Sequence, residues 1–239
     1  MPVPRRREVT PEELARSTGF FPLVGIIIGL ILAGSYWLLH FVLPLSVVSG
    51  LLLTGVAVLS GGLHLDGFVD TLDGLGGHKT AEARLQVAHD SHAGAFGIVG
   101  VFFLLLVKYV TLNSVPETLI MPTLVLMPVV SRWAMVYTIF AYPYARPSGL
   151  GKVFKEGASW HRFLLATFIA LAIAIPLFRL AGLVIMLGVW ITALAMAYYM
   201  KRKFSGLTGD TYGAINEVAE VAVLILVCLL ARNQWLGLA

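Results

Sequence analysis

Charge is scarce in this sequence: 13% of its 239 residues are Asp, Glu, Lys or Arg, whereas 58% are hydrophobic. The mean hydropathy of +0.86 lies far above that of a soluble globular domain. A soluble protein is therefore excluded, and the composition predicts an integral membrane protein. A helix needs roughly 20 apolar residues to cross a hydrocarbon core about 30 Å thick, and several runs of about this length are present.

These apolar runs predict an all-α, polytopic membrane helix bundle with about seven spans and a cytoplasmic N-terminus. Six or eight spans are also compatible with the pattern, because some runs are short or contain proline. Residues 1–239 are expected to form one membrane-embedded domain, since no repeat or low-complexity tract interrupts them. The expected spans are 20–39, 45–63, 95–113, 119–141, 163–178, 181–200 and 216–231.

A short helix is expected before the first span. Thr10-Pro11-Glu12-Glu13 is a capping-box pattern with proline at the first helical position. The segment near residues 9–19 is therefore predicted to form an amphipathic helix along the membrane surface.

Cysteine is also nearly absent. The chain has a single cysteine, Cys228, inside the last apolar run, so one chain can form neither a disulfide nor a thiolate metal site. The Walker pattern G-x-x-x-x-G-K-[ST] does not occur either. Chemistry must come from carboxylates, imidazoles and basic side chains.

The net charge of +4 reflects topology rather than nucleic-acid binding. With the N-terminus in the cytoplasm, cytoplasmic segments hold thirteen of the 17 Lys and Arg residues, as the positive-inside rule expects. Twelve of the 13 acids lie in or beside the same segments. We therefore expect a multi-pass protein of the cell inner membrane whose active site faces the cytoplasm. The thirteen basic residues are Arg5, Arg6, Arg7, Arg16, Lys79, Arg84, Arg146, Lys152, Lys155, Arg162, Lys201, Arg202 and Lys203.

Three aspartates follow the second span closely, in HLDGFVDTLDG at residues 64–74. If the helix continues, Asp66, Asp70 and Asp73 stand at i, i+4 and i+7 and fall within about 60° of one another. Their mutual repulsion favours a bound cation, and clustered oxygens suit Mg²⁺ together with a phosphate ester. The alternative is a solvated acidic helix end.

A second acidic stretch, GLTGDTYGAINEVAE at residues 206–220, precedes the last span. Asp210 and Glu217 differ by seven positions, and Asn216 and Glu220 differ by four, so a helix would carry two short polar stripes. Carboxylates at the start of a membrane helix are costly unless they face a wet cavity or a partner. A favourable interaction with the helix dipole is the simpler alternative.

A third polar stretch, AHDSHAGAFG at residues 88–97, lies at the start of the third span. Asp90 is a candidate ligand or a simple helix cap. His64, His89 and His92 are candidate bases by their usual pKa, although interfacial histidines are often polar spectators.

Two arginines are candidate phosphate ligands. Arg132 lies near the middle of the fourth span, where an intramembrane arginine indicates a functional role or a structural ion pair. Arg146 begins the loop RPSGLGK, which either binds phosphate or only obeys the positive-inside rule.

Five motifs together resemble the cobalamin synthase family, the adenosylcobinamide-GDP ribazoletransferases. They occur in the family's order over most of the chain, and the pairing of the Asp-rich motif with T-G-D-x-x-G-A-x-N-E is specific. One departure is His92, since the family commonly has arginine after Asp-Ser; a phosphate-binding role at this position is therefore in doubt. The motifs are FPLVG at 21–25, HLDGFVDTLDGLGG at 64–77, DSHAGAFG at 90–97, SRW at 131–133 and GLTGDTYGAINE at 206–217.

This resemblance implies a membrane enzyme of the last steps of vitamin B12 assembly. It would join adenosylcobinamide-GDP to alpha-ribazole or alpha-ribazole 5′-phosphate, release GMP and require Mg²⁺. The bilayer is the other expected partner, nucleic acid is not, and a homo-oligomer is compatible. The expected roles are metal binding for Asp66, Asp70 and Asp73, catalysis for Asp210, Glu217 and Asp90, and substrate binding for Arg132, Asn216, Arg146 and His64.

Two other functions compete with this one. Another magnesium-dependent membrane transferase would also use aspartates on a pyrophosphate, but the CDP-alcohol phosphotransferase pattern D-G-x-x-A-R is absent, and a prenyltransferase remains an alternative. A cation transporter would place charges near the midplane of several spans, whereas these lie mostly at one surface.

Overall fold

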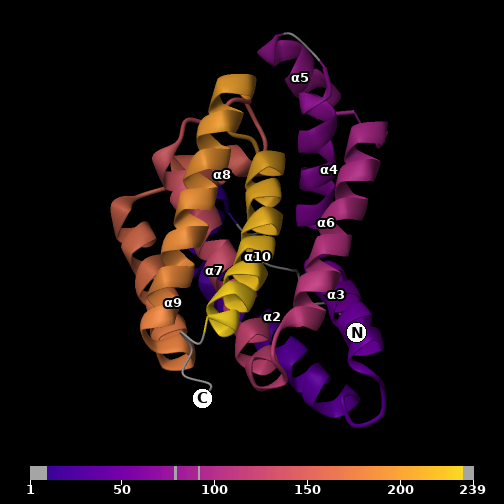
Figure 1. Cartoon of the computed structure of the whole chain (residues 1–239). Helices are drawn as coiled ribbons and strands as arrows, with labels where there is room; N and C mark the ends of the chain where they lie inside the picture. Colours follow the sequence, from indigo (N-terminus) through magenta and orange to yellow (C-terminus); the bar gives the residue numbers. More distant parts are fainter. Residues whose placement is uncertain (1–9, 78–79, 91, 234–239) are drawn as a thin grey trace, which may run out of the picture.

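The structure is a computed structural model that describes residues 10–77, 80–90 and 92–233 (Figure 1). The described residues form helices and connecting turns, with no strand beyond one isolated bridge between Tyr144 and Leu207. The expected all-α class is confirmed. Four of the basic residues used to predict orientation, Arg5, Arg6, Arg7 and Lys79, lie outside the described residues.

The helices follow the expected apolar runs closely. In chain order they are α1 (Pro11–Arg16), the 3₁₀ turn η1 (Ser17–Phe20), α2 (Phe21–Leu39), α3 (Leu45–Leu59), α4 (Leu63–Leu75), α5 (Ala81–Val87), α6 (Ala95–Ser114), α7 (Glu117–Ala141), α8 (Leu150–Glu156), α9 (Trp160–Phe204) and α10 (Gly209–Arg232).

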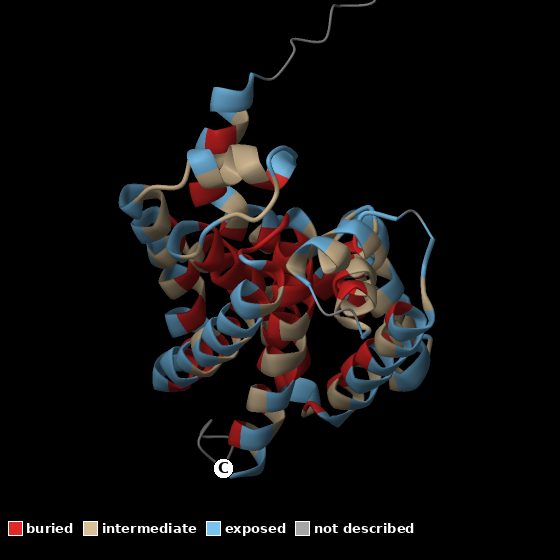
Figure 2. Ribbon diagram, turned by 90° about the horizontal axis from the view of Figure 1, so that it is seen from above, coloured by how far each residue is buried: buried red, intermediate tan, exposed pale blue. Residues whose placement is uncertain are grey.

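α7 forms the centre of the bundle. Its most apolar stretch is 83% buried, whereas that of α6 is 22% buried and leaves most of its surface for lipid. α2, α9 and α10 pack around α7, and the view from above shows the buried residues concentrated in the middle of the bundle (Figure 2). A helix that is apolar on all sides is expected to occupy such a position.

The second expected span does not continue straight into the aspartates. α3 ends at Leu59, and α4 begins at Leu63 after a bend of 87°. Gly61 and Gly62 have φ values of +63° and +71°, which glycine adopts at little cost. The single helix assumed from the sequence is therefore broken, although all three aspartates still lie on one continuous helix, α4.

α9 is a helical hairpin rather than a straight rod. Arg179 has non-helical backbone angles, φ 50° and ψ −132°. A Cβ on Gly182 would collide with the carbonyl oxygen of Ala174, yet these residues would be about 12 Å apart in a straight helix. Figure 1 shows the chain turning back on itself at this point.

The described helices confirm a multi-pass membrane architecture. Five are long and apolar enough to cross a bilayer, and six if the bent α3–α4 pair forms one span. The expected seven counted α9 as two spans, 163–178 and 181–200, and the break at Arg179 lies between those segments.

The predicted capping box is present at the start of α1. The Glu13 backbone N–H donates to Thr10 Oγ1 over 3.2 Å, and the Thr10 N–H donates to Glu13 Oε2 over 3.1 Å. α1 packs against α8, the short helix that follows the loop carrying Arg146.

Candidate functional site

The two acidic stretches meet where α4 crosses α10. A Cβ on Gly67 would lie 2.8 Å from the carbonyl oxygen of Asp210, which is closer than real Cβ atoms come. Gly213 likewise lies against the backbone of His64. Glycine at both positions therefore lets the two helices touch and places Asp66 beside Asp210, although they are far apart in sequence.

Four aspartates line one small cavity of about 310 Å³, and three of them come from α4 and α10. Asp66 and Asp70 reach it from α4, and Asp210 reaches it from the first turn of α10. Asp66 and Asp210 both repel the Asp70 carboxylate, as expected for acids that share a site. We call this space the acidic cavity; its lining is Asp66, Val69, Asp70, Ala88, His89, Asp90, Ala93, Arg146 and Asp210.

Arg146 closes one side of the acidic cavity. Its guanidinium lies 2.7 Å from Asp210 Oδ2 and donates a hydrogen bond of 3.0 Å to the carbonyl oxygen of Ala88. Both side chains of the ion pair are about four-fifths buried, with 19% and 21% exposed. The arginine predicted to bind substrate therefore joins three segments at the cavity: α10, the end of α5 and its own loop.

Asp73, in contrast, points away from the acidic cavity. Its two carboxylate oxygens accept hydrogen bonds from the backbone N–H groups of Gly94, over 2.7 Å, and Gly97, over 2.8 Å. These are free donors at the start of α6, and an anion there is stabilised by the helix dipole. The structure thus gives Asp73 the role of capping a span.

Asp90 lies at the mouth of the acidic cavity with 59% of its side chain exposed. Its carboxylate is 2.7 Å from His92 Nδ1 and also accepts the His92 backbone N–H over 3.1 Å. These hydrogen bonds lower the pKa of the Asp90 carboxyl below its usual value. The partner of the His92 side chain in this structure is therefore the Asp90 carboxylate.

A second, larger cavity of about 890 Å³ adjoins the acidic one. Its walls are mainly apolar and come from α2, the α3–α4 bend, α7 and the loop that follows α7. His64 and Arg132 add polar groups to these walls, and Asp66, His89, Arg146 and Asp210 line both spaces. The site therefore combines a wide, mostly apolar chamber with a small acidic one.

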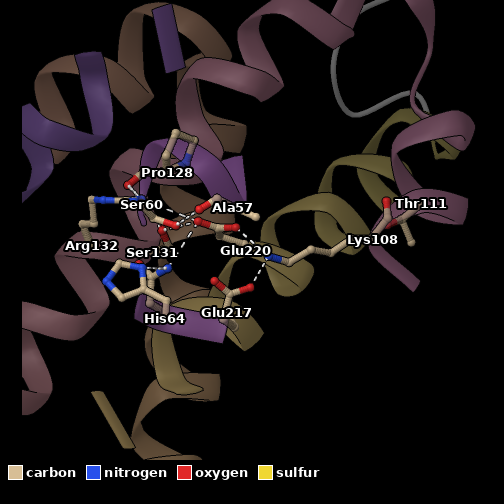
Figure 3. Close-up of polar contacts among 11 residues, drawn as sticks. Ala57, Ser60, His64, Lys108, Thr111, Pro128, Ser131, Arg132, Glu217 and Glu220 are labelled. Carbon is tan, nitrogen blue, oxygen red and sulfur yellow. Dashed lines mark hydrogen bonds and ion pairs between the residues drawn. The ribbon is translucent and has the colours of Figure 1, made fainter. Parts of the chain in front are cut away.

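Behind this larger cavity lies a buried ionic network that joins α6, α7 and α10 (Figure 3). Lys108 Nζ is 2.5 Å from Glu217 Oε2 and 2.6 Å from Glu220 Oε2. Arg132 lies 3.5 Å from the other oxygen of Glu220. Two cations thus balance two carboxylates, and each of these side chains is at least 96% buried.

Glu217 and Asn216 take part in this network rather than lining either cavity. The Asn216 amide nitrogen is 3.0 Å from His64 Nδ1 and 3.3 Å from Glu220 Oε1. The sequence suggested that acids at the start of the last span face either a wet cavity or a partner. Glu217 and Glu220 have a partner, Lys108. Arg132 both pairs with an acid and faces the larger cavity.

Sequence reasoning missed Lys108. The signal was available, because a lone lysine inside an apolar span must find a carboxylate, and Glu217 and Glu220 are acids of another span. Spacing within one segment could not reveal the pairing, since 109 and 112 positions separate the partners.

The acidic cavity fits a magnesium ion by its donor chemistry. Among the described residues, no three acid, imidazole or thiol groups are already placed to hold one metal. In many proteins, Mg²⁺ is bound by only one or two carboxylates, and water and phosphate oxygens complete its coordination. Asp66, Asp70 and Asp210 offer hard oxygen ligands of this kind around one space.

Comparison with known proteins agrees with the resemblance seen in the motifs. A family model described as cobalamin-5-phosphate synthase, CobS, matches residues 1–228. An adenosylcobinamide-GDP ribazoletransferase of Syntrophobacter fumaroxidans is 39% identical over 228 residues, which cover 94% of this chain and 91% of that protein. The protein of the same name from Desulforamulus reducens is 38% identical over 222 residues, covering 91% and 88% of the two chains.

A third relative gives the same result. An adenosylcobinamide-GDP ribazoletransferase of Pseudomonas syringae pv. syringae is 36% identical over 225 residues, covering 92% of this chain and 91% of that protein. No solved structure matches the chain. The full-length family match and these relatives show that the chain belongs to the cobalamin-5-phosphate synthase family.

Proposed function

We propose that this protein is an adenosylcobinamide-GDP ribazoletransferase that joins adenosylcobinamide-GDP to alpha-ribazole or its 5′-phosphate and releases GMP. Its family and its relatives' names support the reaction. The structural observation that carries the proposal is the convergence of Asp66, Asp70 and Asp210 on one cavity. These acids come from two separate family motifs, so a common site explains why both are present.

In the proposed reaction, a hydroxyl of the ribazole attacks the phosphorus that remains attached to cobinamide. The bond from this phosphorus to the oxygen of the GMP phosphate breaks, and the hydroxyl proton leaves to a base. Negative charge therefore builds up on the departing phosphate. Preorganised cations and hydrogen-bond donors aimed at that charge lower the barrier most.

We assign the residues by the cavity that they line. Asp66, Asp70 and Asp210 would hold Mg²⁺, which when bound supplies charge stabilisation to the pyrophosphate. Arg146 lines this cavity beside Asp210 and would donate a hydrogen bond to a phosphate oxygen. Asp90, exposed at the mouth, would accept the proton of the ribazole hydroxyl as an ionised carboxylate, although its lowered pKa makes it a weaker base than an ordinary aspartate.

The larger cavity would take the bulkier part of the donor. Its apolar walls can cover the carbon framework, while Arg132 and His64 offer nitrogen donors to phosphate oxygens. In this proposal the pyrophosphate would lie at the boundary between the two cavities, because Asp66, Arg146 and Asp210 line both.

The protein is a multi-pass membrane protein by its apolar helices. We further propose that it resides in the cell inner membrane with its N-terminus and active site toward the cytoplasm, because both substrates are water-soluble and the segments expected in the cytoplasm hold thirteen of the 17 Lys and Arg residues. A homo-oligomer remains a proposal that cross-linking can test.

The direct test is product formation by purified protein in detergent. Incubation with adenosylcobinamide-GDP, Mg²⁺ and either acceptor should release GMP in step with ribazole consumed, and comparison of the two acceptors identifies the one used. Omission of the acceptor is the matched control. GMP release that does not depend on an acceptor, or none with either acceptor, would refute the proposal.

A further inference from the structure

Asn216 links the ionic network to the larger cavity. Its side chain is fully buried between His64 of α4 and Glu220, one turn further along α10. The amide nitrogen Nδ2 lies 3.0 Å from His64 Nδ1 and 3.3 Å from Glu220 Oε1. An amide NH₂ group has two hydrogens and accepts none, so both of these neighbours act as acceptors.

The opposite orientation of the Asn216 amide is disfavoured by charge. It would turn the amide oxygen toward the Glu220 carboxylate, and two acceptors would then face each other in a buried place. Glu220 stays anionic because Lys108 lies 2.6 Å from one of its oxygens and Arg132 lies 3.5 Å from the other. With the NH₂ group toward His64 and Glu220, the Asn216 amide makes two hydrogen bonds. Its oxygen Oδ1 has no partner among the described residues.

The tautomer of His64 follows from this arrangement. If Nδ1 accepts a hydrogen bond from Asn216, it carries the lone pair, and a neutral imidazole then carries its proton on Nε2. Because Nδ1 carries no proton in this arrangement, the ring is a neutral imidazole and not an imidazolium. Figure 3 shows the His64 ring on the Arg132 side of Glu220, with Lys108 entering from the other side.

We propose that His64 presents its Nε2–H to the larger cavity as a fixed hydrogen-bond donor for an anionic phosphoryl oxygen, and that Asn216, Glu220 and Lys108 are positioning residues that hold this tautomer. The inference rests on the proposed function for the identity of the ligand. It excludes His64 as the base that takes the hydroxyl proton, because Nε2 is already protonated. It also assigns a role to Lys108, because burying the Glu220 carboxylate without this cation would be strongly destabilising.

The tautomer can be measured without any reaction. In full-length protein labelled with ¹⁵N-histidine, the signals that disappear in His64→Gln belong to His64. We expect an unprotonated Nδ1 and a protonated Nε2, and the reverse pattern in Asn216→Asp, because a carboxylate there can only accept from Nδ1. A protonated Nδ1 in the wild type, or an unchanged pattern in Asn216→Asp, would overturn the proposal.

Activity distinguishes a donor from a base at the same position. The amide nitrogen of glutamine reaches about as far as Nε2, whereas that of asparagine reaches only the Nδ1 position. We expect His64→Gln to retain turnover within about tenfold of wild type and His64→Asn to fall about a hundredfold, the usual effect of losing one donor. The control is His161→Gln, because His161 is an exposed residue of α9; this variant should be unaffected.

Equal loss in His64→Gln and His64→Asn would indicate a base and overturn the donor role, and wild-type turnover in both would remove His64 from the reaction. Failure of the proposed function itself looks different. In that case the wild-type protein releases no GMP, while the ¹⁵N pattern still reports whether Asn216 fixes the tautomer.

Discussion

Gly67 of α4 lies directly against Asp210 of α10, so close that a Cβ on Gly67 would be 2.8 Å from the Asp210 carbonyl oxygen and 2.9 Å from its Cα. Backbone atoms cannot move aside as the tip of a flexible side chain can. The acidic cavity therefore depends on the absence of a single methyl group, and its geometry is fixed by packing rather than by the acids.

The first prediction is that Gly67→Ala pushes α4 and α10 apart. Overpacking of this kind typically costs about 1–3 kcal/mol, and the displaced Asp66 and Asp70 should lower turnover more than tenfold. Thermal unfolding and GMP release measure the two effects. Gly50→Ala is the matched control, because nothing lies within 4 Å of its added Cβ, and it should be neutral or slightly stabilising. Equal behaviour of the two variants would contradict the account.

The second prediction separates Asp73 from the other aspartates of α4. Asp66→Asn and Asp70→Asn should raise the Mg²⁺ concentration needed for half-maximal activity, since each removes an oxygen anion from the acidic cavity. Asp73→Asn should instead lower the unfolding temperature by weakening the cap on α6, a loss of about 1–2 kcal/mol. Titration with Mg²⁺ and thermal unfolding of all three variants give the comparison. A shifted Mg²⁺ requirement in Asp73→Asn without loss of stability would restore it as a metal ligand.

The third prediction concerns the buried network. Lys108→Met leaves Glu217 and Glu220 with one cation fewer, and breaking a buried ion pair in this way costs about 3–5 kcal/mol. Adding Glu217→Gln should recover part of that loss, because it removes the carboxylate that Lys108 balanced. Folded yield in detergent and thermal unfolding compare the single and double variants. A double variant less stable than Lys108→Met would mean that Glu217 does not depend on Lys108.

The fourth prediction concerns orientation. In a Cys228→Ala background, a cysteine placed at Lys152, whose side chain is 42% exposed, should resist a membrane-impermeant thiol reagent in intact cells and react after lysis. Lys152 lies on α8, and this helix and the loop before it, which carries Arg146, both border the site, so the result also shows which side the site faces. Ready labelling of intact cells would invert the proposed topology.

Local patterns predicted most of the helices and the shared face of Asp66 and Asp70, because both follow from helical periodicity. The bend at Ser60-Gly61-Gly62 was missed, although consecutive glycines signal a turn. The capping role of Asp73 could not be predicted, since its partners Gly94 and Gly97 lie 21 and 24 positions away on another helix.

The two acidic stretches share the acidic cavity through Asp210 and not through Glu217. Both residues lie on α10, but Asp210 is in its first turn, beside the cavity, whereas Glu217 is two turns deeper and faces Lys108. A spacing of seven puts two side chains on one face of a helix, but it does not say how deep each lies in the bundle. Only the packing of α6 against α10 decides that.

The central claim is that acids from α4 and α10 hold one ion, and a double-mutant cycle in Mg²⁺ dependence tests it most directly. Asp70→Asn, Asp210→Asn and the combined variant are titrated with Mg²⁺ at saturating donor, and the apparent affinities are compared with the wild type. Residues that serve one site are not additive, so the double variant should be little worse than the more damaged single variant. If the two losses add as independent effects, Asp70 and Asp210 do not share an ion, and the account is contradicted.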